Sequence, residues 1–292
     1  MVLSGLIGHK LYVISLKRSR NRREKLKLTL DTMNVDYSFV DAVDGYDLNL
    51  LDAACAFSEE HESTNFETRP SLKPITPFEI ACTLSHIKAI HSASLEKQSG
   101  ALILEDDADF LCTDFFLLSQ ILNLAPENAS YIQIQLLPAV AIDNLFFRFQ
   151  DEKTFFEKKL RSPSVSFAAS KLKHVQCHGT TAYFITNSGI NNILNQVLSD
   201  GRIQFPCSRE QAFLNRNLLA DRYIYWAASD DHCSGYALRI PLITTSAVDS
   251  YLHEGHVADQ KQARLSAIKI YNQFSNDDMY DLIENYTNSS KE

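Results

Sequence analysis

Short apolar runs alternate along the chain with longer stretches in which apolar residues recur at helical spacing. Short, mainly apolar runs are typical of strands buried in a parallel sheet. They occupy residues 11–16, 37–43, 101–104, 131–137, 182–186 and 223–228. Strands that alternate with helices in this way predict an α/β fold with a mainly parallel central sheet.

The clearest predicted helix begins at Thr76, where the local sequence supplies the usual N-terminal signals. Thr76 can cap the helix, Pro77 suits its first turn, and Glu79 completes a capping box. We expect this helix to run to about Leu95. Further helices are predicted for residues 17–33, for residues 188–198 with Ser188 as the cap, and for residues 210–219.

Two internal segments and the C-terminal end give weaker patterns. Residues 46–75 are polar and irregular, which predicts a long surface loop or a partly helical excursion. Residues 141–173 show no pattern that we can assign, so we expect a mobile insertion. The tail after Gly255 is polar and helix-prone, with no core of its own. We therefore expect one domain over residues 1–255 and a helical tail over residues 256–292.

Composition narrows the class of protein. The 292 residues are 45% hydrophobic and 22% charged, which is typical of a folded protein. The formal net charge of -8 argues against a protein devoted to nucleic acid. The 6 cysteines form no CxxC pair, which indicates reduced thiols. With no basic leader and no apolar run of about 18 residues, we expect a cytoplasmic protein without a membrane span.

Three consecutive carboxylates, Glu105-Asp106-Asp107, directly follow an apolar strand. Ligands of open α/β sheets bind beyond the carboxyl ends of strands, where this triplet is expected. Adjacent like charges repel, and a hard divalent cation with oxygen ligands would relieve that repulsion. Such an ion could bridge the carboxylates and a diphosphate. The alternative is a solvated acidic turn, and the spacing alone does not decide between the two.

Two other polar groupings are candidates for binding. The basic stretch from Lys17 to Lys27 could supply an arginine to phosphate or nucleobase; a solvated helix face or attraction to anionic lipid are the alternatives. Glu79, Cys82 and His86 fall at i, i+3 and i+7, so they share one stripe of the predicted helix. That stripe either lines a pocket or packs in the core, with Glu79 explained by capping.

Five short motifs occur in order over about residues 11–189. They are Tyr12-Val-Ile-Ser-Leu-Lys-Arg18 with Arg22-Arg23, Asp41-Ala-Val-Asp-Gly45, Glu79-Ile-Ala-Cys-Thr-Leu-Ser-His86, Leu102-Ile-Leu-Glu-Asp-Asp107 and Gly179-Thr-Thr-Ala-Tyr-Phe-Ile185. Together they resemble glycosyltransferase family 25, the group that contains bacterial lipooligosaccharide galactosyltransferases and the catalytic domains of collagen galactosyltransferases. No single motif is specific, but five in this order rarely arise by chance.

The resemblance implies a GT-A type, Rossmann-like fold and an inverting transfer of a hexose, galactose above all, from a UDP-sugar donor. The acceptor would be a lipooligosaccharide core or a related saccharide, and the new bond a β-glycosidic one. Mn²⁺ or Mg²⁺ would be held by Glu105 and Asp107, and Asp107 would be catalytic. Contact with the inner membrane would follow only from a lipid-bearing acceptor. The implied donor-binding residues are Ser15, Leu16, Arg18, Arg23, Asp44, Glu79, Ser85, His86, Glu105, Asp106, Gly179 and Thr180.

One departure from the family pattern concerns the general base. The family often has a P-x-D element after the G-T-x-A-Y strand, but here residues 205–211 contain no aspartate after Pro206. Inversion requires a base within reach of the acceptor hydroxyl, and Glu210 is our first candidate. Its rivals are Asp230, Asp231 and Asp249. The missing aspartate keeps two alternatives open: a non-catalytic nucleotide-sugar-binding module of the same fold, and a metal-dependent phosphohydrolase that uses the acidic triplet.

Overall fold

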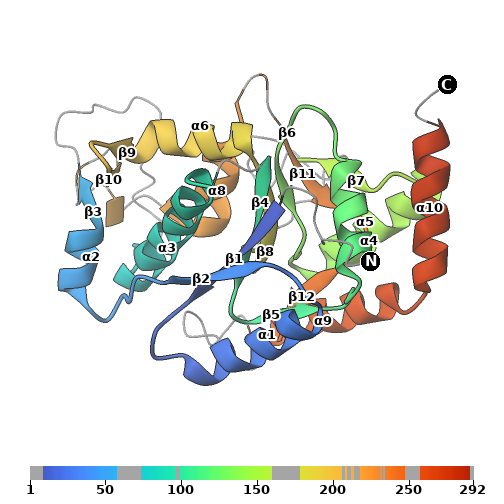
Figure 1. Ribbon diagram of the computed structural model, residues 1–292, viewed down its shortest axis with the longest axis horizontal. Helices are drawn as coiled ribbons and strands as arrows, with labels where there is room; N and C mark the ends of the chain where they lie inside the picture. Colours follow the sequence, from blue (N-terminus) through green and yellow to red (C-terminus); the bar gives the residue numbers. More distant parts are fainter. Residues whose placement is uncertain are drawn as a thin grey trace.

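The fold is built around a seven-stranded sheet, seen in a computed structural model of the chain (Figure 1). The structure describes residues 9–57, 74–96, 99–159, 178–205, 208, 212–213, 218–230, 232, 234–246 and 257–289. In sheet order the strands are β2 (Tyr37–Asp41), β1 (His9–Ser15), β4 (Gly100–Glu105), β8 (Ala182–Thr186), β6 (Ala129–Gln133), β11 (Ser234–Leu238) and β7 (Phe156–Lys158).

The sheet is mainly parallel, as expected, because five of its seven strands run in one direction; β8 and β7 run the opposite way and make it mixed. β1 pairs in parallel with β2 and β4, and β6 pairs in parallel with β11. β8 lies antiparallel between β4 and β6, and β7 is antiparallel to β11. The α/β class is confirmed. The reversed direction of β8 was not predicted, because an apolar run of its length looks the same whichever way it pairs.

Within the described residues, one face of the sheet carries a core of its own under four helices. These helices lie on one side of the sheet in Figure 1. These helices are α2 (Leu48–Ala54), α3 (Pro77–Ser94), α6 (Asn187–Val197) and α8 (Ala220–Ala228). Tyr12, Ile103 and Tyr183 point from the strands into this core. The capping box of α3 is confirmed: the Glu79 backbone N–H donates to the Thr76 hydroxyl over 3.3 Å, and the Thr76 N–H donates to Glu79 Oε2 over 2.6 Å.

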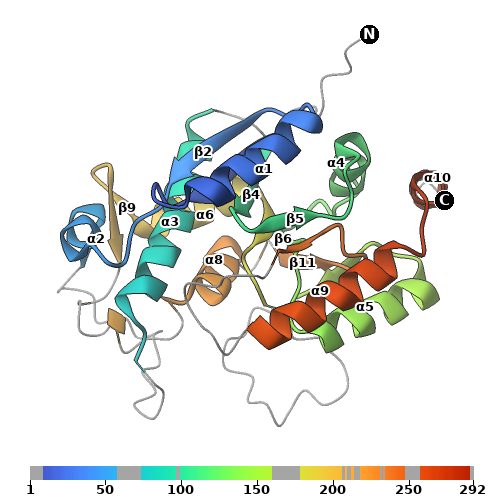
Figure 2. The ribbon, with the colours of Figure 1, turned by 90° about the horizontal axis from the view of Figure 1, so that it is seen from below.

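In the described part of the chain, five helices cover the opposite face. They are α1 (Arg20–Thr32), α4 (Phe115–Asn123), α5 (Ala139–Glu152), α9 (Val257–Tyr271) and α10 (Asn276–Ser289). α9 packs along α5, as Figure 2 shows, and both tail helices bury apolar residues in the core of this face. Within the residues that the structure describes, every helix is too short or too polar to cross a bilayer.

Two short pairings complete the described strands. β5 (Ala108–Phe110), directly after the acidic triplet, pairs antiparallel with β12 (Ile243–Thr245). A small separate sheet joins β3 (Cys55–Phe57), β10 (Arg202–Phe205) and β9 (Leu198–Ser199). The predicted excursion at residues 46–75 thus contains α2 and β3, and its residues 58–73 lie outside the described residues.

Two sequence-based assignments are wrong. Residues 223–228 form part of helix α8, not a strand. Their aromatic and β-branched composition favours a strand, but Tyr223, Ile224, Ala227 and Ala228 are buried at helical spacing. The described part of the segment at 141–173 is ordered as α5 and β7, because Ile142, Leu145 and Phe149 form a buried helical stripe.

Three smaller outcomes concern a helix cap, a predicted helix and the cysteines. Thr186, not Ser188, caps α6, and its hydroxyl accepts from the Gly189 N–H. The predicted helix at 210–219 lies largely outside the described residues. Cys55, Cys82 and Cys112 are free thiols, and the other three cysteines are not described.

Candidate functional site

The acidic triplet stands at the carboxyl end of β4, in the parallel part of the sheet. Ile14 of β1 pairs with Glu105, so Ser15 at the end of β1 lies beside the triplet. Each carboxylate of the triplet has its own set of partners, drawn from different elements. The three side chains therefore have different roles available to them.

Asp106 is held from the β1 and α1 side. The Ser15 hydroxyl donates to its Oδ2 over 2.7 Å, and Arg22 Nη1 lies 3.3 Å from its Oδ1. Burial raises the pKa of Asp106, and the hydrogen bond from Ser15 and the charge of Arg22 offset only part of that effect. Both oxygens are engaged, so Asp106 fixes the start of α1 against the strand ends.

Glu105 is held from the opposite side. The Thr180 hydroxyl donates to Oε1 over 2.6 Å, and Nε2 of the fully buried His86 lies 3.4 Å from the same oxygen. Burial acts to raise the pKa of Glu105, but contact with His86 and the Thr180 hydroxyl outweigh it, and the pKa is lowered. The side chain remains 27% exposed, so a ligand can reach it.

Asp107 is held by the end of β12 and by the residue that follows it. The Thr245 hydroxyl donates to Oδ2 over 3.1 Å, and the Ser246 N–H donates to the Asp107 carbonyl over 2.7 Å. Oδ1 is buried and has no hydrogen-bond partner among the described residues. Burial, followed by the charge of Glu105, raises the pKa of Asp107 to about 7. A buried carboxylate oxygen without a donor indicates a missing cation or hydrogen-bond donor.

A second pair of ion contacts lies at the ends of β1 and β2. Arg23 Nη2 donates to Asp41 Oδ1 over 3.0 Å and to the Ser15 carbonyl over 3.1 Å. Arg18 Nε donates to Asp44 Oδ2 over 2.7 Å, which lowers the pKa of Asp44. The Arg18 guanidinium also lies 5.0 Å from the centre of the exposed Tyr46 ring. Two of the predicted arginines thus flank the strand ends, and Arg18 is held there by Asp44 and Tyr46.

Three further predicted residues make hydrogen bonds that hold the backbone around the site. Ser85 accepts a hydrogen bond from the Val43 N–H over 2.9 Å, which ties α3 to the loop after β2. Glu79 closes the capping box, as its position after Thr76 predicts. The Leu16 carbonyl accepts from the Ser19 N–H, which turns the chain into α1.

Gly179 has a positive φ of 117°, and a Cβ there would lie 2.2 Å from Gln135 Oε1, so the position requires glycine. It directly precedes Thr180, whose hydroxyl reaches Glu105.

A divalent cation fits this site only with help from a ligand. Within the described parts of the chain, no group of three or more His, Cys, Asp or Glu side chains is arranged to hold a metal ion. Asp107 Oδ1 is nevertheless buried and unpartnered in those parts, and Glu105 lies beside it. Mg²⁺ is typically bound through one or two carboxylates together with substrate phosphates, so such a donor set fits a cation carried by a nucleotide.

The candidate bases are only partly described. Glu210, Asp231 and Asp249 lie outside the described residues. Asp230 accepts hydrogen bonds from Asn192 Nδ2 and from the His232 N–H, so it has a structural role after α8.

Sequence reasoning missed three residues that contact the predicted ones. Arg22 was part of a motif but was not singled out. Tyr183 shares a 3.1 Å hydrogen bond with His86 Nδ1, and only its place in the fifth motif pointed to it. Thr245 had no signal at all, because its contact with Asp107 depends on the pairing of β5 with β12.

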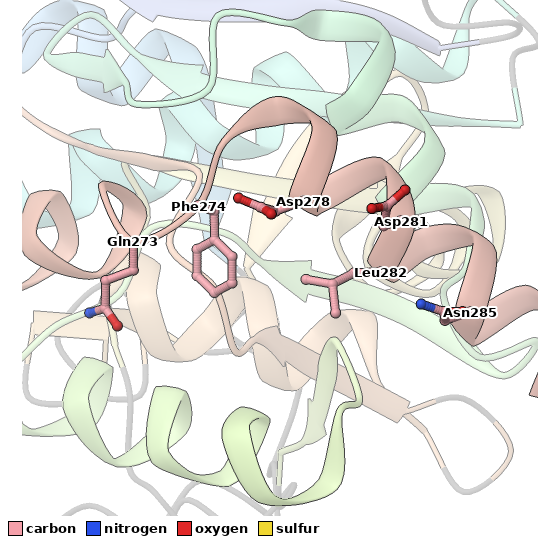
Figure 3. A pocket seen from close by; sticks show the side chains of 6 residues that line it. All are labelled: Gln273, Phe274, Asp278, Asp281, Leu282 and Asn285. Atoms are coloured by element: carbon pink, nitrogen blue, oxygen red, sulfur yellow. The ribbon is translucent and has the colours of Figure 1, made fainter.

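A shallow groove of roughly 330 Å³ lies away from these residues, along α10 (Figure 3). It is lined by Gln273, Phe274, Asp278, Asp281, Leu282 and Asn285. It contains none of the predicted site residues, and we assign it no part in the site.

The chain is similar in sequence to curated glycosyltransferases. Procollagen galactosyltransferase 2 of Mus musculus is 33% identical over 110 residues, which is 35% of this chain and 16% of that protein. Procollagen galactosyltransferase 1-A of Xenopus laevis is 30% identical over 107 residues, with the same shares. A glycosyltransferase 25 family member of Aedes aegypti is 32% identical over 103 residues, which is 34% of this chain and 16% of that protein.

The match to these curated relatives spans only 16% of their length. The family model described as "Glycosyltransferase family 25 (LPS biosynthesis protein)" matches residues 8–202, which include all five motifs. Because that match covers more than half of the chain, the protein belongs to glycosyltransferase family 25.

Proposed function

We propose that the protein is an inverting, GT-A type glycosyltransferase that transfers a hexose, galactose above all, from a UDP-sugar to a lipooligosaccharide core or a related saccharide. The observation that carries the proposal is the buried, unpartnered Oδ1 of Asp107 beside Glu105 at the carboxyl end of β4. The names of the relatives support galactose, and the family description supports a lipopolysaccharide acceptor.

Mn²⁺ or Mg²⁺ would be held by Asp107 and Glu105, together with phosphate oxygens of the donor. When bound, the cation stabilises negative charge on the diphosphate leaving group. Arg18 and Arg23 stand at the neighbouring strand ends and would hold the uridine diphosphate through their guanidinium groups. Asp106 keeps both oxygens on Ser15 and Arg22 and so maintains the shape of the site.

The reaction is a single displacement at the anomeric carbon. The acceptor oxygen forms a bond to that carbon while the carbon–oxygen bond to the β-phosphate breaks, and the electron pair leaves with UDP. The acceptor proton passes to a carboxylate base on the opposite face of the sugar. We propose Glu210 for that base; Asp107 would act on the donor side.

The test is a transfer assay with matched variants. Purified protein with Mn²⁺ is incubated with UDP-galactose, UDP-glucose or a UDP-N-acetylhexosamine and with a glucose- or lactose-terminated acceptor, and products are identified by mass spectrometry. We expect transfer from UDP-galactose and, in parallel, stabilisation of the fold by the preferred donor. Asp107→Asn should reduce transfer by about 100- to 1000-fold or more. Asp143→Asn, on the exposed surface of α5, is the control and should retain activity.

Four results would contradict the proposal or part of it. Donor binding without any transfer would indicate a binding module, and release of phosphate or sugar without an acceptor would indicate a hydrolase. Full transfer by D107N, or transfer unaffected by a chelator, would remove the metal assignment.

A further inference from the structure

Gln133, at the end of β6, is a fully buried amide whose polar groups are engaged. Its Oε1 accepts from Lys159 Nζ, and its Nε2 donates to the carbonyls of Gln135 over 3.0 Å and of Gly179 over 3.2 Å. An ammonium group can only donate, so Lys159 determines which end of the amide is the oxygen. Lys159 thereby directs Nε2 toward Gly179.

The hydrogen bond to Gly179 connects Gln133 to Glu105 through the neighbouring residue Thr180. Gly179 packs closely against Gln135, whose Oε1 would lie 2.2 Å from a Cβ at this position. The next residue, Thr180, donates from its hydroxyl to Glu105 Oε1 over 2.6 Å. A shift of Gln133 would therefore move the hydroxyl that holds Glu105.

A second arm connects Lys159 to the same carboxylate. The Lys159 ammonium lies 5.6 Å from the centre of the Tyr131 ring and 4.4 Å from that of Tyr225, within cation–π range. Tyr131 stacks on Tyr183 with a centroid distance of 5.1 Å. Tyr183 bonds to His86 Nδ1, and His86 Nε2 lies 3.4 Å from Glu105 Oε1.

Both arms thus start at Lys159 and end on one oxygen of Glu105. Burying so many polar groups is unfavourable unless each is satisfied, and an apolar wall would be the simpler way to fill the same space. A network that ends on Oε1 fixes the rotation of the carboxylate and directs Oε2 away from these two arms.

We propose that Lys159 and Gln133, which lie outside all five sequence motifs, are positioning residues that orient Glu105 toward the donor and its cation. This inference rests on the proposed function, because it assigns Glu105 to the donor site. The route through Gln133, Gly179 and Thr180 is the main one, since it consists of hydrogen bonds throughout.

The experiment compares Lys159→Met with Lys158→Met, its exposed neighbour at the end of β7. Binding of Mn²⁺ with UDP is measured by titration calorimetry, and kcat and KM for the donor are measured separately. Loss of a residue that orients a metal ligand typically lowers metal affinity or activity about 10- to 100-fold. We expect that loss in K159M, in affinity for Mn²⁺ with UDP and in kcat, with K158M unchanged and Lys159→Arg restoring most of it.

A second variant acts at the far end of the same route. Thr180→Val removes the hydroxyl that reaches Glu105 and should weaken Mn²⁺–UDP binding to a similar degree. In the double variant the two losses should not add, because they act through one path. If K159M does not fold, T180V alone decides the matter.

The inference is overturned if folded K159M or T180V binds Mn²⁺ with UDP as tightly as the wild type, or if the two losses add fully. Failure of the proposed function has a different signature: the wild type itself would then transfer no sugar with any donor.

Discussion

The two faces of the central sheet bury different kinds of side chain. Beneath α3, α6 and α8 the strands bury polar side chains, among them Gln133 and Tyr183, and Tyr183 bonds to the buried His86 of α3. Beneath α5 and α9 the core is mainly apolar, with Phe146, Phe149 and Phe274 in mutual ring contact. Polar groups are costly to bury unless they are hydrogen-bonded, whereas apolar area stabilises without such constraints. One face therefore supplies stability, and the other positions the acidic site.

The largest expected effect tests the stabilising face. Phe149→Ala should lower the free energy of unfolding by about 3–5 kcal/mol, because it removes a buried ring and leaves a cavity. Transfer activity per folded molecule should not change. Phe147→Ala, at a 63% exposed position of the same helix, should stay within about 0.5 kcal/mol of the wild type. Denaturant unfolding with activity assays checks both; an equal loss of activity per folded molecule in F149A would erase the contrast between the faces.

An intermediate effect compares one hydroxyl on each face. Tyr183→Phe leaves His86 Nδ1 buried without its partner and should cost about 1–3 kcal/mol, with lower transfer activity. Tyr236→Phe removes the hydrogen bond to Asn128 Oδ1 on the other face and should cost about 0.5–1.5 kcal/mol. Its kcat should stay at the wild-type value. A Y236F protein with reduced kcat would show that the division between the faces is wrong.

The smallest effect, taken over one pH unit, concerns protein treated with a chelator. The carboxyl of Asp107 has a pKa of about 7 when folded and an ordinary value of 3.8, so the folded state holds an extra proton between these values. Stability should therefore fall as pH rises through that window, by at most about 1.4 kcal/mol per pH unit. Glu105, with a lowered pKa, contributes the opposite change only below its ordinary 4.5.

Unfolding curves across that window check the pH effect, with Asp107→Asn as the control. The slope should be clearly smaller in D107N, where only Asp106 keeps a raised pKa within the triplet, and the loss caused by F149A should be the same at every pH. A slope of equal size in D107N would assign the effect to another group.

Most of the framework could be predicted from local patterns. The capping box from Thr76 to Glu79 is a signal within four residues, and the apolar runs of β1 and β4 are buried as expected. The assignment at residues 223–228 failed because composition was weighed above spacing. The helix within residues 141–159 was not predicted, although its buried positions do recur at helical intervals. Strand direction depends on how distant segments pair, and no local pattern of β8 reports that.

The site was predictable only where chemistry is contiguous in sequence. The acidic triplet, Ser15, His86 and Thr180 lie in motifs, and the structure brings them together. Gln133 and Lys159 are isolated polar residues, one of them in a segment that we expected to be mobile. Their roles depend on hydrogen bonds between elements far apart in the chain.

The brace on Asp107 has a consequence for protein synthesis. Thr245 follows Asp107 by 138 residues, and the family match ends at residue 202. A chain emerging from the ribosome thus carries its acidic triplet long before the hydroxyl that steadies it has been translated. A fragment cut at the family boundary would keep every recognisable motif and still lack that hydroxyl.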